Sequence, residues 1–263
     1  MAELAAYLAI GTAVGFFAGL LGIGGGIIIV SSLALMFAAH GFPSAYVMHM
    51  AIATSLGAIV AGSWASLRTH HRHGAVDWVV VKRMTPGLLL GVMAGAMLAR
   101  FVPTAFLKFF FLGFALLVTA QMVLDVKPAP SRELPRGGAL AAAGAFIGVF
   151  SGLVGGGAAG IGVPFLTWCN VSTHRAIGTV AALGFPLAIA GSVGYIASGW
   201  SVQGLPRWSV GFVYLPALVA ISATSMLLAP YGARLAHRLP GATLRRIFAI
   251  FLLVLGAKVA ISV

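Results

Sequence analysis

Residues 11–30 read GTAVGFFAGLLGIGGGIIIV, and residues 144–163 read GAFIGVFSGLVGGGAAGIGV. In each stretch an apolar helix meets a cluster of glycines and resumes as a shorter apolar segment. Five glycines recur at one constant spacing: Gly11, Gly15, Gly19, Gly22 and Gly24 correspond to Gly144, Gly148, Gly152, Gly155 and Gly157. Backbone that leaves a helix inside hydrocarbon is tolerated only where protein or a water-filled cavity satisfies its polar groups. Matching breaks in two halves of a chain are therefore typical of a binding site in a transporter.

The composition is that of a membrane protein. Of the 263 residues 60% are hydrophobic and 8% are charged, and the long apolar runs recur from end to end. We therefore expect an all-α, polytopic fold in the lipid bilayer. The net charge of +12 would suggest nucleic acid in a soluble protein, but the basic residues sit in short connections between apolar segments. They are better explained as topology signals, and no nucleic-acid partner is expected.

The apolar runs divide the chain into two repeats. Full spans are predicted at residues 46–67, 84–101 and 106–123, and again at 176–198, 209–229 and 247–263. A segment rich in proline and charge, DVKPAPSRELPRGG, separates the halves. The predicted organisation is a first membrane repeat at residues 1–124, a cytoplasmic linker at 125–137 and a second membrane repeat at 138–263. Each repeat opens with the glycine-broken element.

Both broken elements are predicted to be re-entrant-like hairpins. Residues 5–21 would form a helix about 26 Å long and residues 27–39 one about 20 Å long, and neither comfortably crosses a hydrocarbon layer about 30 Å thick. With two hairpins, one face of the membrane keeps only four of the 16 lysines and arginines, namely Arg100, Lys108, Arg207 and Lys258. The positive-inside rule then places the other basic loops in the cytoplasm, and the halves become inverted repeats.

The candidate substrate-binding residues are glycines of the two breaks and hydroxyls near them. A helix that starts at a glycine cluster directs unpaired N–H groups and about half a positive charge at a ligand, and glycine lets an anion approach closely. Hydroxyls hydrogen-bond an anion without adding fixed charge, although each could instead bond its own helix. The candidates are Gly22, Gly24, Gly25, Gly26, Gly155, Gly156 and Gly157, together with Thr54, Ser55, Ser151 and Thr179. The small-xxx-small glycines earlier in each stretch are better explained by helix packing.

Other chemistries have less support in the sequence. The four carboxylates, Glu3, Asp77, Asp125 and Glu133, lie at segment ends or in loops, so no mid-membrane acid is available for sodium, proton relay or catalysis. No HExxH, GxSxG or paired-carboxylate motif indicates an enzyme. Cys169 lacks metal-ligand spacing, and the histidines at 70, 71 and 73 are better explained as a topological anchor than as a metal site. No metal or cofactor is expected.

The quoted glycine stretches resemble the sulfite exporter TauE/SafE family of membrane permeases. The AIATS and AIGTV segments that follow them, and the ending RLPGATLRRIFAIFLLVLGAK, carry the same resemblance, which covers nearly the whole chain. It implies a bacterial inner-membrane permease for small anions, commonly an exporter of sulfite, organosulfonates or 2-oxo acids. It places the substrate near Gly22, Gly24, Gly25, Gly26, Gly155, Gly156 and Gly157, with Thr54, Ser55 and Thr179 close by.

Several questions stay open at the level of the sequence. An anion channel would share this fold, and an intramembrane enzyme is a weaker alternative. The sequence does not identify the anion, the direction, a coupling ion or whether the chain forms a homo-oligomer. His49 and His174 start equivalent predicted helices and could relay protons, but a satisfied interfacial histidine is the commoner situation.

Overall fold

The fold is all-α and arranged as one bundle. In the computed structural model, residues 2–21, 25–124, 132–135, 137–236 and 241–262 are described. Within these residues the regular secondary structure is helical apart from one small antiparallel hairpin. The elements are α1 (Ala2–Leu21), α2 (Gly26–Ala39), α3 (Val47–Arg72), α4 (Trp78–Ala99), α5 (Thr104–Leu124), α6 (Gly138–Val154), α7 (Ala158–Trp168), α8 (Thr173–Gly199), β1 (Ser209–Val210), β2 (Val213–Tyr214), α9 (Leu215–Ala236) and α10 (Gly241–Ser262).

Length and composition identify four helices that could cross a membrane. Among the described residues these are Val47–Arg72, Trp78–Ala99, Thr104–Gln121 and Thr173–Gly199. Large apolar side chains such as Leu90, Phe101 and Trp200 are exposed on the outside of the bundle. Such a surface is unfavourable in water and is expected against lipid. The prediction of an all-α, polytopic membrane protein is confirmed.

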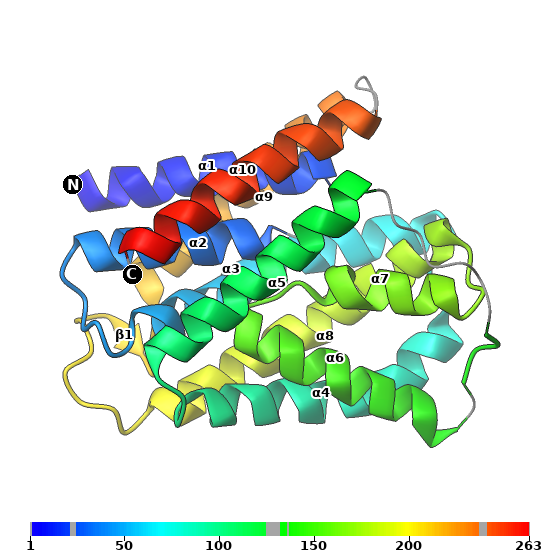
Figure 1. The fold of residues 1–263 in the computed structure, drawn as a ribbon, viewed down its shortest axis with the longest axis horizontal. Coiled ribbons are helices and arrows are strands. Elements are labelled where there is room, and N and C mark those ends of the chain that lie inside the picture. Colours follow the sequence, from blue (N-terminus) through cyan, green and yellow to red (C-terminus); the bar gives the residue numbers. More distant parts are fainter. Residues whose placement is uncertain (1, 22–24, 125–131, 136, 237–240, 263) are drawn as a thin grey trace.

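Each glycine-broken element turns back on itself. Figure 1 shows α1 running from the left end of the bundle toward the right and α2 returning to the left, whereas α6 and α7 start and end at the right. Helix α7 has 11 residues, or about 17 Å, which is about half of a hydrocarbon layer. The two hairpins therefore enter the bundle from opposite ends. This path supports the prediction of inverted repeats, which remains an inference from topology.

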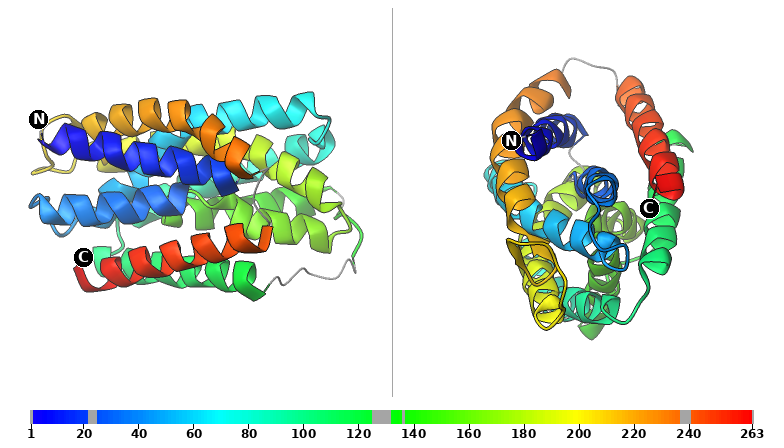
Figure 2. Two further views of the ribbon diagram at one scale, coloured as in Figure 1. Left: turned by 90° about the horizontal axis from the view of Figure 1, so that it is seen from above. Right: turned by 90° about the vertical axis from the view of Figure 1, so that its left-hand side faces the viewer.

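Helices of one repeat pack on helices of the other. Helix α4 lies along α6 and α1 lies along α9, while α3 packs on α8 and α5 on α10. Figure 2 shows α1 and α9 on one side of the bundle and α5 and α10 on the opposite side. If α1 to α5 are the counterparts of α6 to α10 in that order, the α4–α6 pair corresponds to the α1–α9 pair. The α3–α8 pair and the α5–α10 pair each correspond to themselves.

Glycines make the closest of these helix contacts. A Cβ atom built on Gly91 of α4 would overlap the carbonyl oxygen of Ala145, and one on Gly148 of α6 would overlap that of Leu88. A Cβ on Gly15 of α1 would lie 2.5 Å from the Cα of Ser225 in α9. Small residues let membrane helices approach until their backbones touch. The contacts among the described residues show the packing role that was predicted for the glycines preceding each break.

Several predicted span boundaries are wrong. Helix α3 ends at Arg72 rather than at residue 67, and α10 starts at Gly241 rather than at residue 247. Helix α4 starts at Trp78 rather than at residue 84, because the Asp77 carboxylate accepts hydrogen bonds from the N–H groups of Val79 (3.1 Å) and Val80 (3.2 Å) and so caps an earlier turn. The span predicted at 209–229 begins as the β1–β2 hairpin, and its helix starts at Leu215. Most of the predicted linker, residues 125–131 and 136, lies outside the described residues.

The α4–α6 contact gives a stability prediction. Replacing Gly91 by alanine forces the two helices apart, and we expect a loss of about 1 to 3 kcal/mol of unfolding free energy. The matched control is Gly113→Ala in α5, where a Cβ would have nothing within 4 Å. The control is expected to be neutral or stabilising by up to about 1 kcal/mol. Equal unfolding midpoints for both variants in denaturant titrations in detergent would contradict the close contact.

Candidate functional site

The second break consists of three consecutive glycines with positive φ angles. Gly155, Gly156 and Gly157 have φ values of 83°, 121° and 89°. Side chains other than glycine rarely adopt this region. The carbonyl of Ser151 accepts hydrogen bonds from the N–H groups of Gly155 (2.9 Å) and Gly156 (3.0 Å), which closes the end of α6. Helix α7 then starts at Ala158, and the N–H of Gly160 donates to the carbonyl of Gly157 at 2.9 Å. The N–H groups of Ala158 and Ala159 precede this first hydrogen bond of the helix.

The first break is described from Gly25 onward. Gly25 has a φ of 51° and precedes α2, and its carbonyl accepts the N–H of Ile29 at 3.0 Å. Two of the candidate residues, Gly22 and Gly24, lie outside the described residues. The start of α2, like that of α7, presents backbone N–H groups that its own helix cannot satisfy.

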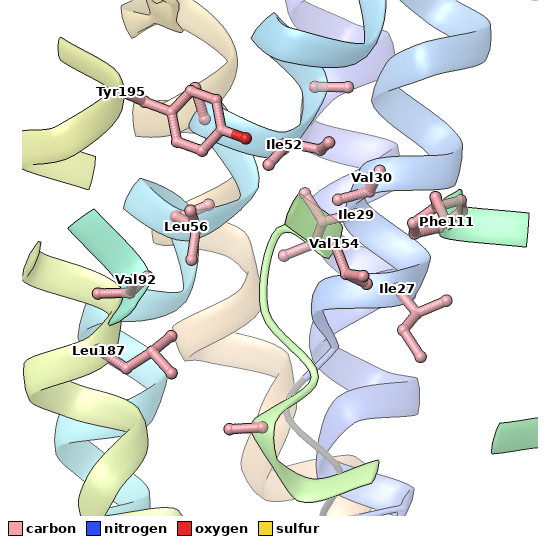
Figure 3. Close-up of a cluster of buried hydrophobic side chains, with 14 of the residues drawn as sticks. Ile27, Ile29, Val30, Ile52, Leu56, Val92, Phe111, Val154, Leu187 and Tyr195 are labelled. Atoms are coloured by element: carbon pink, nitrogen blue, oxygen red, sulfur yellow. The ribbon is translucent and has the colours of Figure 1, made fainter. Parts of the chain in front are cut away.

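The two breaks meet inside the bundle. A Cβ atom on Gly26 would lie 2.9 Å from the carbonyl oxygen of Gly155 and 3.4 Å from the Cα of Gly156. Figure 3 shows Val154, at the end of α6, beside Ile29 and Val30 of α2. We call Gly25, Gly26, Gly155, Gly156 and Gly157 the glycine crossing. Segments about 130 residues apart in the sequence thus share one buried point.

One hydroxyl spans the glycine crossing. Ser55 Oγ in α3 lies 3.0 Å from the carbonyl oxygen of Gly155 and 3.3 Å from that of Gly26, and Ser55 is fully buried. Its single proton can be donated to one carbonyl at a time or shared between both. Ser55 therefore holds the two breaks together through the backbone. Its proton is engaged by protein, so any contact with an anion requires that hydrogen bond to open.

The remaining candidate hydroxyls occupy different places. Thr54 and Thr179 are fully buried and accept the backbone N–H groups of Tyr214 and Asp77, each at 3.0 Å. These partners precede α9 and α4, so the structure ties both threonines to chain connections rather than to the glycine crossing. Ser151 is 2% exposed, and its Oγ has no hydrogen-bond partner among the described residues.

The walls of the glycine crossing are apolar. Phe114 of α5 lies against Gly157, since a Cβ there would be 2.8 Å from the ring, and Ile59 of α3 lies against Gly156. Among the side chains that the structure describes, no Asp, Glu, Lys or Arg is buried. The polar groups available at this point are therefore backbone groups and hydroxyls. The sequence did not single out Phe114 or Ile59, because an aromatic and an aliphatic residue in apolar helices carry no distinguishing signal.

His49 and His174, which lie at the starts of the helices predicted to be equivalent, α3 and α8, have different environments. His49 Nε2 lies 2.8 Å from the carbonyl oxygen of Ala99 and 3.1 Å from that of Val102, so its ring joins the start of α3 to the end of α4. His174 is exposed at the start of α8. In the part of the chain that the structure describes, no three His, Cys, Asp or Glu residues are placed to hold a metal ion.

One supporting side chain was missed by the sequence analysis. Tyr195 of α8 is fully buried, and its hydroxyl donates a hydrogen bond of 2.8 Å to the carbonyl of Gly152 in α6. It thereby supports the last turn of the helix that leads into the second break. A tyrosine within an otherwise apolar helix was the available signal, because a buried phenol needs a partner.

Comparison with known proteins gives one family and several similar chains. A model of the family described as "Sulfite exporter TauE/SafE" matches residues 7–259. A Haemophilus influenzae protein named "Probable membrane transporter protein" is 35% identical over 253 residues, which cover 95% of each chain. The Bacillus subtilis protein named "Probable membrane transporter protein YdhB" is 28% identical over 251 residues, which cover 90% of this chain and 91% of that one. No solved structure matches the chain.

The Ser55 bridge gives a second stability prediction. Replacing Ser55 by alanine leaves the buried Gly155 carbonyl without its hydroxyl donor, and we expect a loss of about 1 to 3 kcal/mol. The control is Ser63→Ala on the same helix, where Ser63 Oγ donates only to the carbonyl of Val60 in its own helix. That variant is expected to change stability by less than about 0.5 kcal/mol. Thermal unfolding in detergent measures the stability of both variants. An equal loss in both would show that the Ser55 bridge stabilises the protein no more than a hydrogen bond within one helix.

Proposed function

We propose that this chain, which belongs to the sulfite exporter TauE/SafE family, transports small anions across the membrane. The proposed substrates are sulfite, organosulfonates or 2-oxo acids, and the proposed direction is export. The proposed location is the bacterial inner membrane, with the connection between α3 and α4 on the cytoplasmic side. The basic residues of that end support this orientation through the positive-inside rule.

The observation that carries the proposal is the meeting of the two breaks at Gly26 and Gly155. Helices α2 and α7 both start there, and each start is equivalent to about half a positive charge. Two helix starts that share one buried point favour a negative charge between them, without any charged side chain. A water-poor environment strengthens this attraction because the local dielectric constant is low.

The proposed substrate-binding groups are the backbone N–H groups at the starts of α2 and α7, with Ser55 and Ser151 beside them. Gly155 and Gly156 line this site, while their own N–H groups donate to the carbonyl of Ser151. Ser151 supports this assignment because its buried Oγ has no partner among the described residues and can still donate. Gly22 and Gly24 are included from the sequence repeat. Thr54 and Thr179 were also predicted to bind the substrate. Their hydroxyl oxygens accept the backbone N–H groups of Tyr214 and Asp77, and each hydroxyl keeps its own proton to donate.

The buried chemistry supports an anion rather than a cation. Carriers that bind cations in the membrane typically use intramembrane carboxylates, and the described side chains include no buried acid. No enzymatic activity is proposed, because the family resemblance and the named relatives all concern transport. No metal or cofactor is proposed.

Flux into reconstituted vesicles tests this proposal. Gly26→Leu pushes the second break away from α2, and we expect saturable uptake of sulfite or sulfoacetate to fall about tenfold or more. The control is Gly62→Leu in α3, where a Cβ would meet nothing within 4 Å. Both variants are compared at equal amounts of folded protein.

Two results of this assay would contradict the proposal. Unchanged flux in Gly26→Leu would remove the glycine crossing from the transport path. Flux that does not saturate with substrate concentration would indicate an anion channel instead of a transporter.

A further inference from the structure

Two threonines make the same contact at opposite ends of the bundle. Thr54 lies in α3, and its Oγ1 accepts the N–H of Tyr214 at 3.0 Å. Thr179 lies in α8, and its Oγ1 accepts the N–H of Asp77 at 3.0 Å. Both threonines are fully buried. Tyr214 directly precedes α9, and Asp77 directly precedes α4.

The two contacts close different ends of the molecule. In Figure 1 the β1–β2 hairpin and the start of α9 lie at the left end, whereas α4 starts at the right end. Helices α3 and α8 pack on each other along the centre. Thr54 thus joins α3 to the β1–β2 hairpin, at the end of the bundle where α3 starts. Thr179 joins α8 to the connection before α4, at the end where α8 starts.

The surroundings of the two contacts differ. At the right end Arg175 Nη2 lies 3.2 Å from Asp77 Oδ2, so an exposed ion pair accompanies the Thr179 contact. At the left end the ring of Tyr214 packs on aromatic rings, with centroids 5.7 Å away for Phe37 and 5.2 Å away for Phe42. One end is held by polar contacts and the other by apolar packing.

We propose that the Thr54–Tyr214 and Thr179–Asp77 contacts are two latches that open in alternation and admit the ligand from one end at a time. This rests on the proposed transport function. The first latch is directly coupled to the glycine crossing, because Ser55, which bridges the two breaks, follows Thr54 in the chain. At the corresponding place in α8 Thr179 is followed by Val180, which has no hydroxyl to offer.

The physical reason is the buried N–H group. When the hydrogen bond to a threonine breaks, the backbone N–H that it held needs another acceptor. Water can supply that acceptor only if the same end of the bundle opens. Breaking both contacts at once would leave two donors to satisfy, whereas breaking one leaves the other end closed. Both contacts are formed in this structure, which therefore represents a state closed at both ends.

Side-specific thiol labelling tests the latches. The reporter is Ser151→Cys in a Cys169→Ser background, since Ser151 is buried near the second break and its Oγ gives up no hydrogen bond among the described residues. A membrane-impermeant maleimide is added to right-side-out and to inside-out vesicles. The variants are Thr54→Val and Thr179→Val, which keep the shape of the side chain and remove its hydroxyl.

Each variant is expected to act from one side. Thr179→Val should speed labelling about fivefold from the end at which α4 starts, and Thr54→Val by a similar factor from the other end, the factor for loss of one ordinary hydrogen bond. The control is Thr119→Val, because the buried Thr119 hydroxyl donates to Ala115 of its own helix. Equal acceleration from both sides, no acceleration, or the same effect in the control would overturn the proposal.

A second variant guards against misfolding. Arg175→Gln removes the ion pair with Asp77, and the Arg175 side chain is 55% exposed, so the fold should tolerate the change. It should also speed labelling from the α4 end alone, and a two-sided or absent effect would count against the latch. Labelling is measured without any anion, and sulfite flux is measured in the protein that retains Ser151. One-sided opening together with absent flux in that protein would refute the proposed substrate and leave the latches standing.

Discussion

The structure depends on one constraint, which is that every backbone N–H and C=O group inside hydrocarbon needs a partner. Two helices of this chain stop in the middle of the bundle, where lipid cannot satisfy their ends. The protein meets this need by bringing the two interruptions together, with Ser55 between the carbonyls of Gly26 and Gly155. The N–H groups at the starts of α2 and α7 precede the first hydrogen bonds of their helices, and they are the groups to which we assign the anion in the proposed function.

The close packing of glycines serves the same end. Helix α6 can carry the second break only if it is held in place, and α4 holds it along its length through contacts such as Gly91 with Ala145. Tyr195 secures its last turn. The glycine-packed outer helices and the central helices α3 and α8 thus both position the breaks, and α3 and α8 also connect them to the ends of the bundle.

The sequence predicted the helical membrane fold and the two breaks well, because helix packing alone seldom requires three consecutive glycines between apolar segments. It could not predict that the breaks touch, since the contact between Gly26 and Gly155 depends on how the two halves dock. It also could not predict which groups Thr54 and Thr179 contact, because a hydroxyl near a break gives no sign of its partner. Their actual donors, Tyr214 and Asp77, lie 160 and 102 residues away.

Local chemistry explains the errors at the segment ends. Hydropathy placed the start of α4 after Lys82 and Arg83, whereas the helix cap at Asp77 starts it before them. Long basic side chains can lie on the end of a membrane helix and reach toward water. An acidic residue just before an apolar run was the signal for this cap.

The most direct test of the central claim is a nuclear magnetic resonance titration of the protein labelled with ¹⁵N-glycine in lipid nanodiscs, with sulfite as the probe. If the glycine crossing binds the anion through its backbone, the amide signals of Gly26 and Gly157 will shift and saturate. Those of the packing glycines Gly87, Gly91 and Gly144 will stay in place. Shifts confined to exposed glycines such as Gly74 and Gly204, with the crossing unchanged, would contradict the account.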